Sequence, residues 1–155
     1  MSFFDQPRVL RKFVDIDRRR RRLVLQAFVV VAASRVLLAI MPLRKVRPLM
    51  PALARVVIRR PKPTALAELV WALSAANRRV SGACLSNALA AESLLARYGY
   101  TPVLRIGATL TTGTLTAHAW VEHDGEVVIG GPESVVRQYS PFPNLDAFNT
   151  SGLKT

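Results

Sequence analysis

The chain has 155 residues, half of them apolar, which is enough for one domain with a hydrophobic core but too few for two. Its charge is uneven, because residues 1–62 carry 16 Lys and Arg against three acids, a net +13, whereas residues 63–155 carry six basic and seven acidic residues, a net −1. With one cysteine and two histidines the chain can form neither an internal disulfide nor a zinc cluster of four Cys and His ligands, so we expect no metal and no cofactor.

The N-terminal segment, residues 1–62, is both basic and apolar. Its start, MSFFDQPRVLRK, places charged side chains where a signal peptide needs an apolar stretch, so we expect a cytoplasmic protein, either free or peripheral at the membrane. A basic surface of this kind suits nucleic acid, anionic lipid or an acidic protein partner.

A long apolar helix is predicted after the five consecutive arginines Arg18–Arg22. The stretch LVLQAFVVVAASRVLLAIMP is apolar on nearly all sides of a helix, so it must pack on several sides or rest partly on lipid. Gln26 and Arg35 interrupt it before the ~18–20 uninterrupted residues that a membrane span needs. We therefore expect a helix packed in the core, and a helix on a membrane surface is the second interpretation.

Prolines punctuate the chain after this helix. Pro42, Pro48 and Pro51 predict a break, which leaves at most a short helix over residues 52–59. The run RRPKP that follows predicts a connector. We therefore divide the chain at residue 62, into an N-terminal helical segment for docking and core packing and a catalytic part, residues 63–155.

Two amphipathic helices are predicted beyond the connector. The first begins after Thr64, a candidate N-cap, and its apolar side chains recur with helical spacing at Leu66, Leu69, Val70 and Leu73. The second runs from about Ser81, its candidate N-cap, to Tyr98, and ends at Gly99.

An alternating pattern replaces the helical one after the second helix. It predicts three strands, over residues 102–110, 115–123 and 126–130. Asp124-Gly125 is a strong signal for a two-residue hairpin turn, and that turn pairs Val121 with Val128. Helices followed by a small antiparallel sheet indicate an α+β fold.

Cys84 is predicted to lie in the first turn of the second helix. Backbone N–H groups there have no acceptor within the helix, and the positive end of the helix dipole stabilises a thiolate. The same N–H groups could hold the oxyanion that forms when a nucleophile attacks a carbonyl. A lone cysteine on an alanine-rich helix also has a simpler interpretation, as a small buried residue.

His118 is the candidate base for this cysteine. It lies in the middle of a predicted strand, in AHAWVE, between two alanines that leave room for a helix to approach. Cysteine at a helix start and histidine on a later strand is the chain order of papain-like and transglutaminase-like enzymes. The simpler interpretation is a core histidine. Trp120 shares the His118 face and is expected to line a cleft or to pack.

A resemblance to a known family follows from these motifs together. The segments CLSNALAAESLLARYGYTPVLRIGATL, AHAWVEHDGEVVIGG and YSPF, within residues 80–142, resemble the standalone transglutaminase-like leader peptidase of lasso peptide biosynthesis. The resemblance implies a transglutaminase-like, papain-like cysteine protease core that removes the leader peptide from a ribosomally made precursor. Cys84 would be the nucleophile and His118 the general base and acid. The implied partners are the precursor leader, a small recognition protein that presents it, and a cyclase resembling asparagine synthetase.

The third catalytic residue is where the sequence departs from this family. An aspartate is expected on the strand after the histidine, near the position of Gly130. The predicted hairpin register places His118 opposite Gly131, with Glu133 two residues further along on the same face. Glu133 is therefore the predicted orienting residue, and a backbone carbonyl or a water is the alternative.

Other classes of function stay open at this point. Residues 1–62 lack the interleaved aromatic residues and the recognition helix of a nucleic-acid-binding module, so we expect no nucleic acid partner. A membrane- or nucleic-acid-associated basic binding protein, in which Cys84 and His118 are structural, is the alternative to an enzyme. Within acyl transfer, an amine could replace water as the second nucleophile, as in a transglutaminase.

Overall fold

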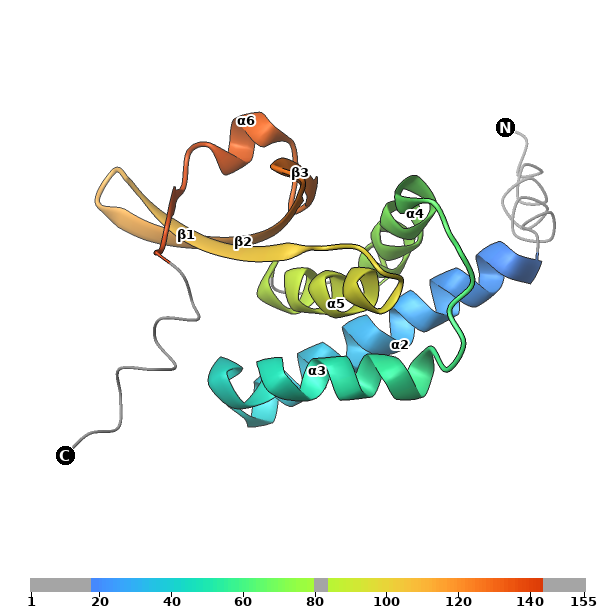
Figure 1. Cartoon of the computed structure of the whole chain (residues 1–155). Helices are drawn as coiled ribbons and strands as arrows, with labels where there is room; N and C mark the ends of the chain where they lie inside the picture. Colours follow the sequence, from blue (N-terminus) through green and yellow to red (C-terminus); the bar gives the residue numbers. More distant parts are fainter. Residues whose placement is uncertain (1–17, 80–83, 144–155) are drawn as a thin grey trace, which may run out of the picture.

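A computed structural model describes residues 18–79 and 84–143 (Figure 1). Its helices are α2 (Arg18–Ile40), α3 (Leu43–Val57), α4 (Leu66–Asn77), α5 (Cys84–Arg97) and α6 (Glu133–Val136). Its strands are β1 (Val103–Thr111), β2 (Thr114–His123), β3 (Glu126–Ile129) and β4 (Ser140–Pro141). The predicted α+β class is confirmed, because four helices precede an antiparallel sheet in these residues.

Helix α5 lies between the other long helices and the sheet, as Figure 1 shows. It contacts α2, α3 and α4 on one side and β1 and β2 on the other. Three of its alanines are almost fully buried, and their small side chains let neighbouring elements approach closely: Ala88, Ala90 and Ala91. The hydroxyl of Ser34, on α2, donates a hydrogen bond of 2.8 Å to the Ser86 carbonyl of α5. Helices α2 and α3 therefore share one core with α4 and α5.

Helix α2 packs into this core along one face. Its buried residues include Ala27, Val30 and Val31, and its buried Gln26 side chain accepts a hydrogen bond of 2.8 Å from the Tyr98 hydroxyl. The polar interruption noted in the sequence is thus satisfied inside the protein. By length and composition alone, α2 is also the one helix among residues 18–79 and 84–143 that could cross a bilayer, and 33% of its most apolar stretch is buried.

Helix α3 corrects the expectation that prolines leave only a short helix. It runs through Pro48 and Pro51, and both rings are exposed. Val46, Met50 and Ala54 recur every four residues on its opposite face and are fully buried. Because the prolines lie on the solvent side, water can reach the carbonyls that lose their N–H donors, and burial of the other face offsets the lost hydrogen bonds.

The sequence predicts where α5 ends but not which residue caps the beginning of α4. The predicted cap at Thr64 is wrong, because Ala65 occupies the N-cap position of α4 and the Thr64 hydroxyl bonds to the backbone elsewhere. Helix α5 ends as predicted at Gly99, which has φ +93°. Beyond the last helical residue, Arg97, the Tyr100 N–H donates a hydrogen bond of 3.1 Å to the Leu95 carbonyl, the 6→1 bond of a Schellman motif.

The sheet has the strand order β3-β2-β1-β4 and is antiparallel throughout. The hairpin between β2 and β3 turns at Asp124-Gly125 as predicted, with φ values of 51° and 82°. The predicted pairing of Val121 with Val128 is wrong. A β-bulge shifts the register by one residue, so that Val121 pairs with Ile129.

A crossover that the sequence analysis did not predict covers one face of the sheet. The chain leaves β3, forms the short helix α6 and then pairs as β4 with β1, on the other side of the sheet from β3 (Figure 1). Beneath it Trp120 is only 2% exposed. Gly107 makes this packing possible, since a Cβ there would lie 2.7 Å from the Ser140 carbonyl oxygen and 2.9 Å from the Trp120 ring.

Candidate active site

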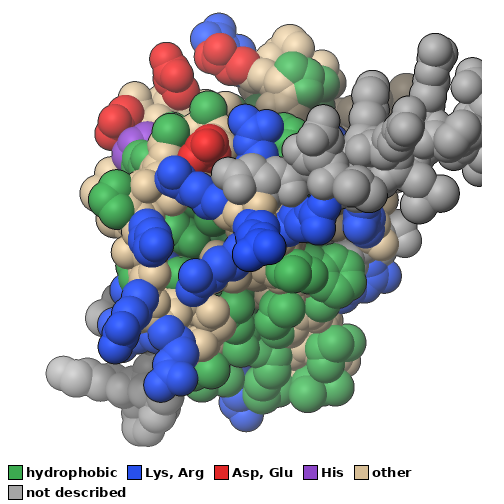
Figure 2. Space-filling view, turned by 90° about the vertical axis from the view of Figure 1, so that its right-hand side faces the viewer, with side chains coloured by type: hydrophobic (Ala, Val, Ile, Leu, Met, Phe, Trp, Pro, Cys, Tyr) green, Lys and Arg blue, Asp and Glu red, His purple; other side chains and the backbone are tan. Residues whose placement is uncertain are grey.

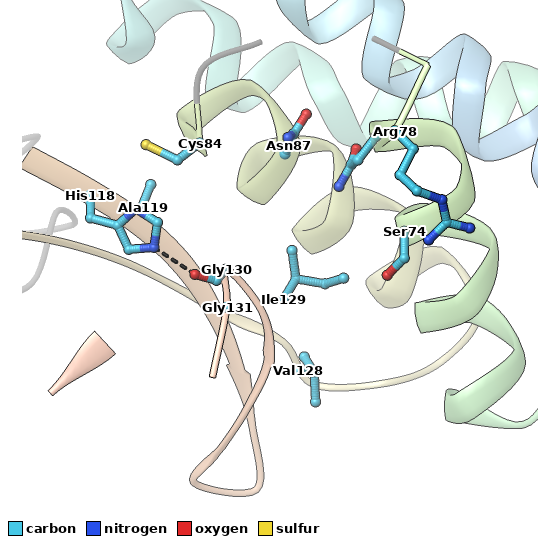
Figure 3. A pocket seen from close by; sticks show the side chains of 11 residues that line it. Ser74, Arg78, Cys84, Asn87, His118, Ala119, Val128, Ile129, Gly130 and Gly131 are labelled. Carbon is cyan, nitrogen blue, oxygen red and sulfur yellow. Dashed lines mark hydrogen bonds between the residues drawn. The ribbon is translucent and has the colours of Figure 1, made fainter. Parts of the chain in front are cut away.

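A pocket of about 550 Å³ lies where β3 leaves the sheet, beside the C-terminal end of α4 and the beginning of α5. Figure 3 shows Cys84 and His118 at one end of it and Arg78 and Ser74 at the other. The two residues that the sequence pairs by type and chain order therefore line one pocket. They are 34 positions apart in the chain and come from α5 and β2.

Cys84 is the first described residue of α5, and its thiol is free and partly buried. Figure 3 shows its sulfur at the His118 end of the pocket. The predicted cap, Ser81, and the backbone N–H groups before Cys84 lie outside the described residues, so the oxyanion site remains a prediction from sequence.

His118 has a defined tautomer. Its Nε2 lies 2.6 Å from the backbone carbonyl oxygen of Gly130. Since a carbonyl can only accept a hydrogen bond, Nε2 must carry the proton in this bond. The lone pair of the neutral ring is then on Nδ1, and Nδ1 is the atom that can take a proton from a thiol.

Two aromatic rings fix the position of the His118 ring. Trp120 stacks on it, with ring centroids 6.2 Å apart, and Tyr139 of the crossover lies on it at 5.0 Å. Trp120 is itself held, because its indole N–H donates to a Glu122 carboxylate oxygen at 2.8 Å and Arg105 donates to the other oxygen at 3.1 Å. The prediction that Trp120 shares the His118 face is confirmed. Tyr139 was missed, although it begins the YSPF motif.

Gly130 stands where the family resemblance expects an aspartate, and the structure explains why no side chain is present. Its φ is +121°, and a Cβ built there would lie 2.4 Å from the Trp120 Cβ and 2.8 Å from the Trp120 Cα. Both observations exclude a carboxylate at this position. The partner of His118 is instead the backbone carbonyl of the same residue. The alternative that the sequence analysis left open is therefore the contact that the structure contains.

Glu133, the predicted orienting residue, lies elsewhere. It begins α6, and its carboxylate accepts a hydrogen bond of 3.0 Å from Nε of Arg137, one turn further along. The side chain is 64% exposed. The bulge shifts the register on which the prediction was based. In addition, β3 ends at Ile129 and Glu133 begins α6, so Glu133 does not lie on a strand that faces His118. Within the described ranges the contacts join Glu133 to Arg137 and give its predicted role no support.

The thiol and the imidazole share the pocket without a hydrogen bond between them in the described structure. Catalytic hydrogen bonds are often long or absent before substrate binds, and rotation about the cysteine χ1 angle moves a sulfur by several ångströms. The Gly130 contact thus holds the imidazole in place, and the thiol has to approach Nδ1 before it can transfer its proton. Residues 18–79 and 84–143 contain no cluster of three or more His, Cys, Asp or Glu suitable for a metal.

One comparison with known proteins decides the family. A family model of the transglutaminase-like superfamily matches residues 14–143. The chain belongs to this superfamily. Transglutaminase-like proteins are generally cysteine peptidases or acyltransferases, and the match includes α2 and α3 as well as the sheet. No curated protein and no solved structure matches the chain.

Two asparagines that the sequence analysis missed, Asn77 and Asn87, also line this pocket. Asn87 lies one turn after Cys84 on the same helix, a spacing that places both on one face. The Oδ1 atoms of Asn87 and of Asn77, on α4, are buried and have no hydrogen-bond partner among the described residues. Buried acceptors of this kind cost stability unless a donor reaches them. The backbone N–H groups of a bound peptide are suitable donors.

Proposed function

We propose that the protein is a cysteine peptidase that cleaves a peptide bond through a thioester on Cys84. The observation that supports this most strongly is the shared pocket of Cys84 and His118, in which the Gly130 carbonyl holds His118 with Nδ1 unprotonated. Membership of the transglutaminase-like superfamily, with its cysteine peptidases and acyltransferases, agrees with this chemistry.

The proposed reaction has two halves that use the same base. In the first, Nδ1 of His118 takes the thiol proton, the sulfur attacks the peptide carbonyl carbon, and the C–N bond breaks as the leaving amine takes that proton. The acyl group is then a thioester on Cys84. In the second, Nδ1 takes a proton from water and the hydroxide attacks the thioester. The C–S bond then breaks as the sulfur takes that proton back from Nδ1, which releases a carboxylic acid and restores the Cys84 thiol.

Gly130 has a positioning role in this proposal. Its carbonyl holds the Nε2 proton and so keeps the ring in the productive tautomer. A carbonyl dipole stabilises the imidazolium less than a carboxylate does, because it carries no net charge. We therefore expect a slower enzyme than one with an aspartate in this position.

The proposed substrate is a ribosomally made lasso peptide precursor, which the protein would cleave between its leader peptide and its core. The motifs within residues 80–142 support this choice, since they resemble the standalone leader peptidases. A small recognition protein would present the leader, and a cyclase resembling asparagine synthetase would act on the freed core. These reactions would take place in the cytoplasm.

The test combines the purified protein with a lasso peptide precursor and its leader-recognition protein, and follows the products by mass spectrometry. The wild type should yield a leader with a free carboxyl end and a core peptide. Hydroxylamine added to the mixture should divert part of the leader to its hydroxamate, which reveals the thioester. Cys84→Ala should yield neither product. Equal cleavage by Cys84→Ala would contradict the proposal, and transfer to an added amine in preference to water would assign the protein to the transglutaminases.

A further inference from the structure

Helix α2 presents an exposed apolar stripe on the face opposite its core contacts. We define the apolar stripe as the large exposed side chains of α2: Leu25, Phe28, Val29, Val36 and Ile40. Their spacing of three, four or seven residues keeps them within one side of the helix. Between 38% and 71% of each side chain is exposed. The stripe spans the 16 residues from Leu25 to Ile40, about 22 Å at the rise of an α-helix.

Positive charge continues the stripe and surrounds it. Arg18 and Arg22 are exposed and extend the same helical face by one to two turns. Residues 18–62 contain 13 Lys and Arg and neither Asp nor Glu. Figure 2 shows one side of the molecule, where apolar side chains lie next to a band of Lys and Arg and the acidic side chains gather at the far end.

Not every arginine in the cluster before the stripe faces outwards. Arg19 pairs with Glu68 at 3.5 Å, and the Arg20 guanidinium lies over the ring of Trp71. These two contacts fix the start of α2 to α4. The arginines that share the face of the apolar stripe are thereby held on the opposite side of the helix.

We propose that the apolar stripe lies on the surface of a bilayer that contains anionic phospholipid. The stripe offers aliphatic side chains and one phenylalanine to the acyl region, and Arg18 and Arg22 at its N-terminal end can reach anionic headgroups. Burial of apolar area and attraction to anionic lipid are the two terms that hold a helix in the membrane interface. Residues 18–62, which include the stripe, contain no acidic side chain that would repel an anionic surface.

The other face of α2 decides between lying on the membrane and crossing it. Gln26 and Ser34 on that face are bonded to Tyr98 and to the Ser86 carbonyl, and a spanning helix would have to break both bonds. A helix on the surface keeps them. Because α5 lies between α2 and the sheet (Figure 1), α5 then separates His118 on β2 from the lipid.

Flotation of the full-length protein with vesicles tests the proposal. Phosphatidylcholine vesicles that contain phosphatidylglycerol should carry the protein, and added salt should weaken this binding, whereas phosphatidylcholine alone should carry little. Val36→Glu, in the stripe, should weaken binding by about tenfold or more. The matched control is Leu115→Glu, because Leu115 is 72% exposed against 61% for Val36 and lies on β2, outside the stripe. The control should bind as the wild type does.

A second measurement reports the depth of the stripe. Phe28→Trp in a Trp71→Phe background places one exposed tryptophan in the stripe, while Trp120 stays buried. Brominated acyl chains should quench its fluorescence. Failure of the wild type to float, equal binding by the two glutamate variants, or binding without quenching would each overturn the proposal. The last two results would mean that the vesicles attract the arginines by charge alone, without insertion of the stripe, and would favour an acidic protein as the partner. None of these outcomes depends on peptidase activity.

Discussion

The two sides of helix α5 are built in different ways. On the helical side, stability is spread over many contacts, including the Ser34 hydrogen bond to α5 and a partly buried ion pair of 2.9 Å between Arg47 and Glu92. On the sheet side, the proposed site depends on one hydrogen bond, from His118 to Gly130, and on the rings that hold it. We therefore expect changes on the helical side to alter the free energy of unfolding and changes on the sheet side to alter the rate of cleavage.

His118→Ala gives the largest expected effect on the sheet side. Removal of the base should lower the rate of precursor cleavage by about a thousandfold, within the range known for general acid–base groups. The matched control is His123→Ala, since His123 lies on the same strand but contacts Thr101 and Asp124 near the hairpin turn. It should cleave within about twofold of the wild type. If both variants lost cleavage rate equally, the loss would come from damage to strand β2 and not from removal of the His118 imidazole.

Gly130→Ala should have the next largest effect. The new Cβ would meet the backbone and Cβ of Trp120, so the carbonyl that holds His118 has to move. We expect cleavage to slow by about ten- to a hundredfold, as for other groups that orient a catalytic histidine. Gly131→Ala is the control, because its φ of +109° brings similar backbone strain but no atom lies within 4 Å of the new Cβ. A comparable loss of rate in Gly131→Ala would attribute the effect to strain.

Tyr98→Phe tests the helical side. It leaves the Gln26 side chain without its donor and should lower the free energy of unfolding by about 1 kcal/mol, with cleavage unchanged. Burial raises the pKa of Tyr98 above its usual 10.0, opposed by Arg22, Arg19 and Arg97. Folding thus favours the neutral phenol, so its contribution is complete below pH 10 and is lost as the pH rises through the raised pKa. Urea unfolding at neutral and alkaline pH should show a loss in the wild type that the variant lacks.

The same contrast explains what could be predicted from the sequence. The two helices around Leu69 and Leu89 follow from apolar periodicity, and α2 follows from its long apolar run. The hairpin follows from Asp124-Gly125, because local pattern decides each of these elements. The length of α3 was underestimated, because the low helix propensity of proline can be read from the local sequence, whereas the burial of Met50 depends on packing against distant parts of the chain. Tertiary packing outweighed the local signal there.

The candidate site divides in the same way. Residue type and chain order were enough to select Cys84 and His118, which line one pocket. The contact with Gly130 could not be found by residue type, because every residue has a backbone carbonyl and a β-bulge leaves no mark in the sequence. Tyr139 reaches His118 through a crossover whose pairing with β1 is long-range, so local patterns did not predict it.

Glu133→Gln should have the smallest effect, and it separates the two candidates for the orienting group. Since the Glu133 carboxylate is exposed and bonded to Arg137, its loss should change cleavage by less than about twofold. The precursor assay should then show a slow Gly130→Ala and an unchanged Glu133→Gln, because only the first displaces the atom bonded to Nε2. The reverse pattern would mean that α6 turns Glu133 towards His118 when substrate binds, and that the carbonyl only holds the resting ring.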